Sequence, residues 1–416
     1  MPVGRSFWAV ERRMALLFGI CLAASLPLSA QSDSQSAKPY ATLDRQSVTY
    51  RGPVPATESA QPDGAVVIGL ILPLRGPQEP EGKALLAAAR IALEEEQARG
   101  AFPKGRRLAL AVRDESGQWG RASSEILKLI EEDHALVVIT SSNGATAHQA
   151  EQIANKISFP ILTLASDPTT TETNISWLFR LGPSDTDQAR AMAREISEQP
   201  GQGRTLLVVQ MDHDGRAGGE EFEKAAREMK MAAPERLELS SSAPQLESIE
   251  AAIHATAPDA IVVWADASAA KQLLPSIQQA APSARVYLCS KAAQLSSASA
   301  AANLSTGSSR GSGELLTVAT SAGATEVAKE RFAKEYQARV GSTPGIAAFQ
   351  AYEAVQLVVA GIRAKGVNRI LLREYFANTE KVHSATGDIA FDPAGNSMQE
   401  FSIVRVTNAA ATVAGK

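Results

Sequence analysis

The residues that could bind a small molecule gather in polar turns after apolar runs. The first turn, Thr140-Ser-Ser-Asn-Gly-Ala-Thr146, follows Ala135–Ile139 and opens a helical stretch. Small hydroxyls and free backbone N–H groups at a helix N-terminus can hold a carboxylate or a phosphate without a full charge. The same residues are typical of ordinary N-capping, and both roles can coexist. We therefore expect Ser141, Ser142 and Asn143 to contact a ligand, to cap the helix, or to do both.

A second turn, Leu164-Ala-Ser-Asp-Pro-Thr169, follows another apolar run. Ala165 and Ser166 offer backbone carbonyls and one hydroxyl. Asp167 could add a negative charge, but Asp before Pro is also an ordinary start of a turn. Both interpretations stay open at this stage.

The third turn, Gln210–Gly219, contains the acidic and imidazole side chains of Asp212, His213 and Asp214. These neighbours could bind a metal, although a loop of solvated charges is the better interpretation. Asp214 could equally cap a helix that begins at Gly218. We carry Asp214 forward as a candidate ligand contact.

Further candidates each stand just past the end of an apolar run, and they are Arg75, Asp266 and the pair Ser290-Lys291. Arg75 could meet an acidic group of a ligand. A solvated rim is the alternative interpretation for all of them.

No pattern of an enzyme or of a metal centre is present in the sequence. The five histidines show no metal spacing, and HExxH, GxSxG and GxxxxGK[ST] are all absent. We expect a protein that is not an enzyme and that carries neither a metal nor a cofactor.

A repeated pattern must position these turns: a short apolar run, a polar turn and then an amphipathic helical stretch. The runs include Val66–Leu72, Leu136–Thr140, Thr205–Gln210 and Ala260–Ala265. Continuous apolar runs separated by helices are typical of parallel sheets buried on both faces. The pattern predicts an α/β fold with two Rossmann-like units in tandem, and such sheets bind ligands at the carboxyl ends of their strands.

The N-terminus reads as a targeting segment. Three arginines precede the apolar stretch Met14–Ala24, and small residues end it near Ala30. This is typical of a secretory signal peptide over residues 1–30, which predicts a periplasmic or otherwise extracytoplasmic protein. An uncleaved anchor helix is the alternative. Lipidation of Cys21 is a third possibility, although Ile20 fits a lipobox poorly.

The chain has 416 residues, and its composition is that of a soluble globular protein. Its formal net charge is −4. This charge, with no basic stripe, argues against nucleic-acid binding.

Residues 31–64 are rich in Ser, Gln, Pro and Asp and predict a disordered leader or tether. After cleavage Cys289 is the single cysteine, so no intramolecular disulfide is expected. No later segment is long and apolar enough to span a membrane.

The sequence resembles the type I periplasmic solute-binding proteins of the leucine/isoleucine/valine-binding branch, the receptors of branched-chain amino-acid ABC importers. Its similarity covers about residues 66–408 and lies in short motifs that occur in the family's order. These motifs are Ile68–Pro77, Gly82–Glu95, Arg113–Gly117, Phe159–Pro168, Phe179–Gln188, Tyr336–Pro344, Ala351–Ala354 and Thr386–Asp392.

The resemblance implies two lobes joined by a three-strand hinge, with the ligand trapped between them. Lobe one would comprise residues 66–182 plus 318–382, and lobe two residues 183–317 plus 383–408. It also implies that Ser141, Ser142 and Asn143 hold a ligand carboxylate, and that Ala165 and Ser166 hold an ammonium group.

Asp214 stands where the family usually has a tyrosine that faces the ligand. An anion in this place argues against an apolar amino acid and favours a cationic or polyhydroxylated solute. We expect a receptor that delivers a small polar solute, an amino acid or a related compound, to an ABC permease. The alternative is a sensor or scaffold that acts on an envelope receptor, kinase or enzyme.

Overall fold

The apolar runs form the strands of two sheets. The computed structural model describes residues 58–406 and 412–413, apart from gaps at 60, 63, 101, 103–104, 118–119, 174, 200–202, 241–245, 295–313, 321–325, 379–380, 385–386 and 407–411. The predicted signal peptide and most of the predicted leader lie outside the described residues.

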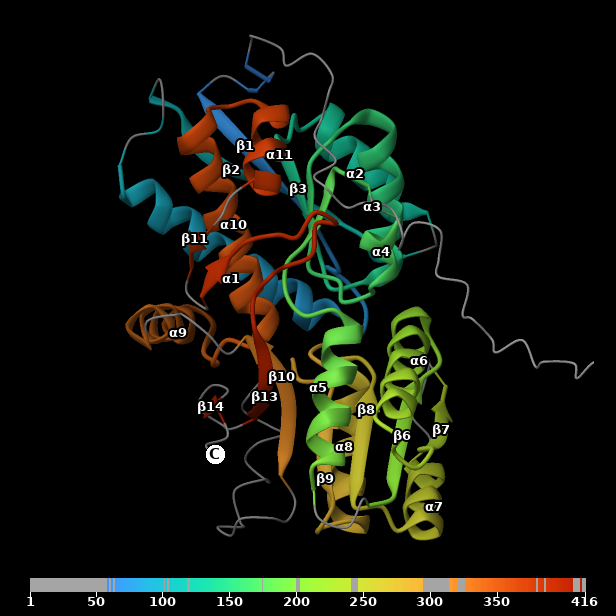
Figure 1. The fold of residues 1–416 in the computed structure, drawn as a ribbon. Helices are drawn as coiled ribbons and strands as arrows, with labels where there is room; N and C mark the ends of the chain where they lie inside the picture. Colours follow the sequence, from blue (N-terminus) through green and yellow to red (C-terminus); the bar gives the residue numbers. More distant parts are fainter. Residues whose placement is uncertain are drawn as a thin grey trace, which may run out of the picture. The chain divides into compact units, whose positions relative to one another are not determined.

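Lobe one is built on a parallel sheet with the strand order β2-β1-β3-β4-β5 (Figure 1). The apolar strand β1 sends Val66 and Ile68 into one core cluster, and Val67 and Ile71 into another. Burial on both faces explains why these runs are continuous rather than alternating. The strands are β1 Ala65–Leu72, β2 Arg107–Asp114, β3 Val137–Thr140, β4 Ile161–Thr163 and β5 Leu178–Arg180.

Helices cover both faces of this sheet. Residues of α1 and α10 belong to one of its core clusters, and residues of α2 and α3 belong to the other. The helices of this lobe are α1 Glu79–Ala98, α2 Arg121–Glu131, α3 Gly144–Ile157, α4 Thr169–Glu172, α9 Glu326–Val340, α10 Ile346–Lys365 and α11 Arg369–Asn378.

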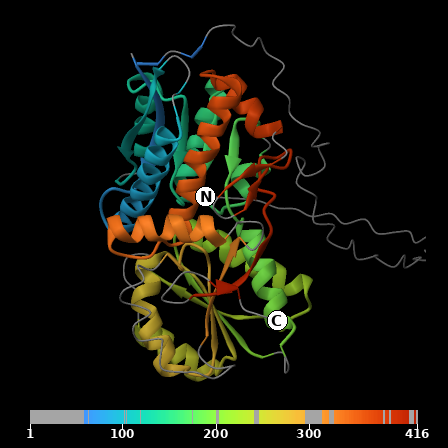
Figure 2. The same ribbon diagram turned by 90° about the vertical axis from the view of Figure 1, so that its left-hand side faces the viewer.

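Lobe two is built on the second sheet, with the strand order β14-β13-β10-β9-β8-β6-β7. Strands β6 to β10 are parallel, and β13 pairs antiparallel with β10. The strands are β6 Thr205–Gln210, β7 Glu235–Leu239, β8 Ala260–Trp264, β9 Arg285–Leu288, β10 Leu315–Thr320, β13 Phe401–Arg405 and β14 Thr412–Val413. The helices are α5 Asp185–Ser197, α6 His213–Glu228, α7 Leu246–Thr256 and α8 Ala267–Ala280. Figure 2 shows the two sheets from the side.

The predicted α/β class with two parallel-dominated sheets is confirmed. Within the described residues the chain passes between the lobes three times: after β5, after β10 and before β13. At the outer crossings, Arg180 and residues 395–397 lie side by side, since Arg180 N–H donates to Gly395 O at 2.7 Å and Ser397 N–H to Arg180 O at 3.0 Å.

Two lobe boundaries differ from the expected ones. Strand β10 of lobe two runs to Thr320, whereas the expected boundary was 317/318. Ile389 and Phe391 pack in the core of lobe one, together with the short pair β11 Val382–His383 and β12 Asp388–Ile389. The return to lobe two therefore comes after Phe391 instead of at 383. Packing of these apolar side chains against the lobe-one sheet decides the boundary, and no local sequence signal marks it.

The described end of the predicted leader is bound to lobe one. Ser59 N–H donates to Val367 O at 2.8 Å, and the Gln61 side chain accepts from Val67 N–H at 2.8 Å. Glu58 pairs with Arg106 at 3.0 Å. Among the described residues, no helix is both long and apolar enough to cross a bilayer.

Candidate functional site

The predicted anion-binding turn lies at the N-terminus of α3, directly after β3. Asn143 is the N-cap: its Oδ1 accepts from Ala145 N–H at 3.0 Å and from Thr146 N–H at 3.3 Å. The N–H of Gly144 takes no part in this cap. It donates to Asp214 Oδ1 of lobe two at 3.0 Å.

Asp214 reaches this turn from the first turn of α6. That helix begins at His213, and its cap is Asp212, whose Oδ1 accepts from Gly215 N–H at 2.8 Å. The expectation that Asp214 could cap a helix from Gly218 is therefore wrong. The carboxylate of Asp214 therefore contacts the same turn to which the resemblance assigned a ligand carboxylate.

Lys291, just past β9, neutralises this carboxylate. Its ammonium group forms a salt bridge with Asp214, and its side chain is only 9% exposed. Burial alone would lower the pKa of Lys291, but the nearby Asp214 and Glu81 raise it above its usual range, so the side chain is charged.

Two further carboxylates lie beside the turn: Glu115 after β2 is buried, and Glu81 at the start of α1 is partly buried. The hydroxyl of Ser142 donates to Glu81, and that of Ser141 donates to Glu115 Oε1 at 2.7 Å. Burial raises the pKa of both carboxyls, in Glu115 to about 8. The hydroxyls that were predicted to bind a ligand thus donate to the protein's own carboxyl groups. The nearby charge of Lys291 lowers the pKa of both Glu81 and Glu115, against the effect of burial.

Ala165 and Ser166 lie after β4, as expected. Ala165 is fully buried, and its N–H donates to Thr163 Oγ1 at 3.1 Å. The carbonyl of Ser166 accepts from Asp185 N–H at 2.7 Å, in the first crossing to lobe two. Ser166 therefore binds the crossing in this arrangement, and Ala165 is packed beside it in lobe one.

The structure does not bring Arg75 and Asp266 into the same cluster. Arg75 is 63% exposed and bonds to Asp114 Oδ2 at 2.6 Å. Asp266 caps α8, where its Oδ1 accepts from Ala269 N–H at 2.8 Å. The rim interpretation fits Arg75, and a capping role explains Asp266.

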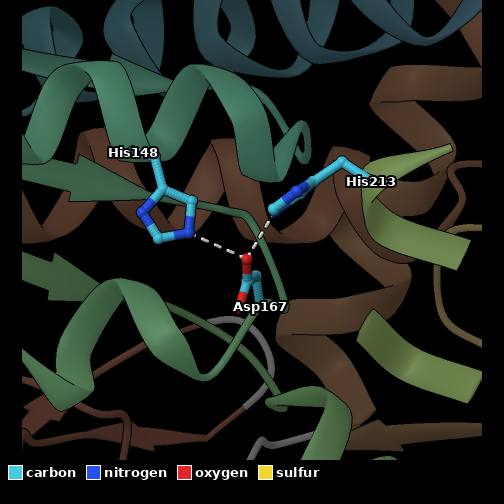
Figure 3. A group of neighbouring side chains, drawn as sticks. All are labelled: His148, Asp167 and His213. Atoms are coloured by element: carbon cyan, nitrogen blue, oxygen red, sulfur yellow. Dashed lines mark hydrogen bonds and ion pairs between the residues drawn. The ribbon is translucent and has the colours of Figure 1, made fainter. Parts of the chain in front are cut away.

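A second polar cluster joins the lobes next to Asp214. His148 of α3 and His213 of α6 both face the carboxylate of Asp167 (Figure 3). Asp167 Oδ2 lies 3.0 Å from His148 Nε2 and 2.7 Å from His213 Nε2. These three donor atoms all lie within 4.8 Å of one another.

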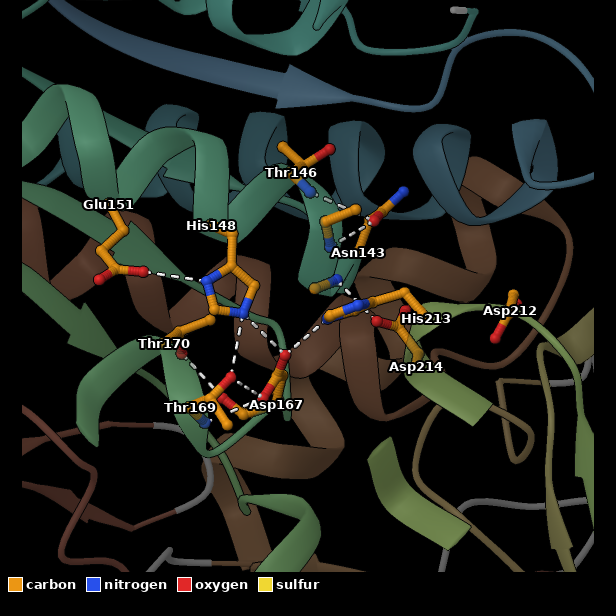
Figure 4. A network of polar contacts seen from close by, with 12 residues as sticks. Asn143, Thr146, His148, Glu151, Asp167, Thr169, Thr170, Asp212, His213 and Asp214 are labelled. Carbon is orange, nitrogen blue, oxygen red and sulfur yellow. Dashed lines mark hydrogen bonds and ion pairs between the residues drawn. The ribbon is translucent and has the colours of Figure 1, made fainter. Parts of the chain in front are cut away.

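The charges of this cluster stabilise one another. Burial alone would raise the pKa of Asp167, but hydrogen bonds from His148, His213 and Thr169 lower it. Asp167 in turn raises the pKa of both imidazoles, in His148 to about 10 with a further contribution from Glu151. Figure 4 shows the network, including the cap of Asn143 beside it.

The loop of Asp167 is fixed from several sides. Arg180, which is buried, donates from Nη1 to Asp167 O at 2.6 Å. The Oδ1 of Asp167 accepts from the N–H of Thr169 at 2.9 Å and from its hydroxyl at 2.6 Å. Its carboxylate is therefore oriented independently of the two imidazoles.

Sequence reasoning missed His148 and the acids Glu81 and Glu115. His148 lies inside a helix, one turn beyond the predicted anion turn, and its partners come from distant parts of the chain. The available signal was positional: Asp167 and His213 each follow a strand's carboxyl end, the edge where open parallel sheets gather their functional residues.

Solved structures with the same fold include a leucine-binding protein from Thermotoga maritima, with 19% identity, a TM-score of 0.71, and coverage of 84% of this chain and 98% of that one. A solute-binding protein from R. palustris in complex with benzoate has 19% identity, a TM-score of 0.72 and coverage of 84% and 95%. An ABC-transporter substrate-binding protein from Desulfitobacterium hafniense in complex with Leu has 17% identity, a TM-score of 0.66 and coverage of 84% and 99%. No curated protein sequence matches the chain.

The family model described as "Periplasmic binding protein" matches residues 65–411, which is most of the chain. The resemblance read from the sequence motifs is thereby confirmed, and the chain belongs to the periplasmic binding protein family.

Proposed function

We propose that this protein is an extracytoplasmic binding receptor, not an enzyme, that traps a small solute of net positive charge between its lobes and delivers it to an ABC importer. Family membership supports the receptor role, and structural relatives are named as ABC-transporter proteins. The predicted signal peptide agrees with a periplasmic location.

The observation that carries the cationic preference is the excess of buried and partly buried carboxylates around the turn. Glu81, Glu115 and Asp214 share one buried ammonium group, that of Lys291. The second oxygen of Glu115 makes no hydrogen bond of standard geometry within the described chain. A carboxyl group buried in this way gains most from a ligand that brings a positive charge.

The hydrogen bonds of this turn argue against a solute that carries a carboxylate and no positive charge. The Gly144 N–H is taken by Asp214, and the hydroxyls of Ser141 and Ser142 are taken by Glu115 and Glu81. A ligand carboxylate entering here would face three acids, and a buried charge without a partner costs several kcal/mol.

Calorimetry in two buffers of different ionisation enthalpy tests this proposal, with L-arginine, spermidine, L-leucine and benzoate as probes. A cation should lower the pKa of Glu115 on binding and release a proton near pH 7, because that pKa is about 8 without a ligand. We expect binding and proton release for arginine or spermidine, and neither for leucine or benzoate.

Glu115→Gln should abolish most of the proton release. Glu79→Gln is the matched control, because Glu79 lies in the same turn of α1 as Glu81 but pairs with the exposed Lys83. Preference for leucine or benzoate, or proton release unchanged in Glu115→Gln, would contradict the proposal.

The contact between Asp214 and Gly144 favours a second candidate, a sensor or scaffold of the envelope. Here the protein's own carboxylate joins the lobes in place of a ligand. This alternative predicts no thermal shift with any cationic, neutral or anionic solute, together with X-ray scattering of a closed form in the absence of solute.

A further inference from the structure

We propose that His148, Asp167 and His213 form a binding site for a divalent transition-metal ion of the zinc class, and that the ion fastens the two lobes together. This inference does not depend on which solute the protein carries. Sequence reasoning considered a metal only for the neighbours Asp212, His213 and Asp214, whereas the fold brings His148, Asp167 and His213 together.

The donor set is the one that zinc takes in proteins. Imidazole nitrogens and carboxylate oxygens bind Zn²⁺ at about 2.0–2.2 Å, usually with four ligands in a tetrahedron. Donors around such an ion lie ~3.4 Å apart. Asp167 Oδ2 lies 3.0 Å from His148 Nε2 and 2.7 Å from His213 Nε2. To hold an ion, the first distance must lengthen by a few tenths of an ångström and the second by about 0.7 Å.

The orientation of the rings is also suitable. The planes of the His148 and His213 imidazoles lie at 89° with their centroids 5.5 Å apart, so both Nε2 atoms face one point without stacking (Figure 3). His213 is 42% exposed, which leaves a path for an ion and for water as a fourth ligand.

The surroundings provide an independent argument. Metal-binding histidines nearly always donate their other ring N–H to a carboxylate or carbonyl, which fixes the tautomer. His148 Nδ1 lies 3.0 Å from Glu151 Oε2, and Glu151 is buried on the next turn of α3. Asp167 is held in turn by Thr169 and Arg180. Such support of both a histidine and a carboxylate is typical of metal sites (Figure 4).

The ligands come from both lobes. His148 and Asp167 belong to lobe one, and His213 belongs to α6 of lobe two. An ion held by all three therefore bridges the lobes, next to the contact of Asp214 with Gly144. Binding of the ion should favour the closed arrangement, since only that arrangement assembles the third ligand.

The test is a titration of the full mature chain with Zn²⁺ against a chromophoric chelator at pH 7.5, with Co²⁺ as a spectroscopic probe. We expect one equivalent of Zn²⁺, and intense visible Co²⁺ bands of a tetrahedral site. His213→Ala should weaken binding at least ~10-fold, and the variant should stay folded because the His213 side chain is 42% exposed. Glu151→Gln should weaken it about 10- to 100-fold, as loss of a supporting carboxylate does.

His383→Ala is the matched control, because His383 also contacts a carboxylate, that of Asp388, but is 88% exposed and belongs to no metal-type cluster among the described residues. Its affinity should equal that of the wild type. Three results would each overturn the proposal: no stoichiometric binding, equal affinity in His213→Ala, or an equal loss in His383→Ala. Circular dichroism of each variant shows whether it is folded, and His148→Ala provides a second test from lobe one.

Discussion

Asp214 of lobe two accepts a hydrogen bond of 3.0 Å from the backbone N–H of Gly144, the first residue of α3 in lobe one. The positive end of the helix thereby receives a carboxylate from the protein itself. Lys291 holds that carboxylate from the other side. One side chain thus links the Thr140–Thr146 turn of lobe one to the buried cation of lobe two.

Asp214→Asn should destabilise the protein strongly. It leaves the Lys291 ammonium buried without its main partner, and breaking a buried pair costs about 3–5 kcal/mol. Urea unfolding should show this loss. The double variant Asp214→Asn, Lys291→Met removes the orphaned charge and should recover part of the loss, although Glu81 and Glu115 then also lack their nearby cation. A double variant as unstable as the single one would mean that the pair does not carry the effect.

Ser142→Ala should lower stability by about 1–3 kcal/mol, because the partly buried Glu81 loses a hydrogen-bond donor. In a Glu81→Gln background the same change should cost clearly less. A double-mutant cycle by chemical denaturation measures this coupling. Additive losses would show that Ser142 contributes in some other way, for example through backbone conformation.

The strands of the two sheets can be predicted from local sequence pattern. A strand such as Val66–Leu72 is buried on both faces, and its sequence is therefore a continuous apolar run. The turn Thr140–Thr146 was also predictable, since a polar turn after a strand and before a helix has few other readings. Asn143 caps α3 by contacts within three residues, and such contacts are encoded locally.

The roles of Asp214 and His148 could not be predicted in the same way. Asp214 has its partners in another lobe and in another loop, and the sequence spacing of these residues carries no distance information. The acids Glu81 and Glu115 were overlooked for a similar reason. Their burial depends on how the lobes close over α1 and β2, and a glutamate is otherwise expected at the surface.

Asp185 should make stability depend on pH. Burial raises the pKa of this carboxyl to about 7 in the folded protein, from an ordinary value of 3.8. Between these values the folded state binds more protons than the unfolded state, so the contribution of Asp185 to stability falls as pH rises from about 4 to about 7. Asp185→Asn should gain stability relative to the wild type over this range. Urea unfolding at pH 4, 5.5 and 7 measures the difference, and a constant difference would place Asp185 in contact with water.

Gly144→Ala tests how closely the lobes approach each other. A Cβ at this position would lie 2.4 Å from Asp214 Oδ1, closer than real Cβ atoms come, and 3.0 Å from His213 Cδ2, which is a tight contact. Within α3 the change is favourable by up to about 1 kcal/mol, since Ala is the better helix former. We therefore expect lobe one to stay folded while the lobes separate, which X-ray scattering detects as a larger radius of gyration. Gly345→Ala is the control, because its nearest neighbour, Gln294 Cα, is 3.8 Å from the added Cβ. A variant with the dimensions of the wild type would show that Asp214 and His213 can move aside without opening the lobes.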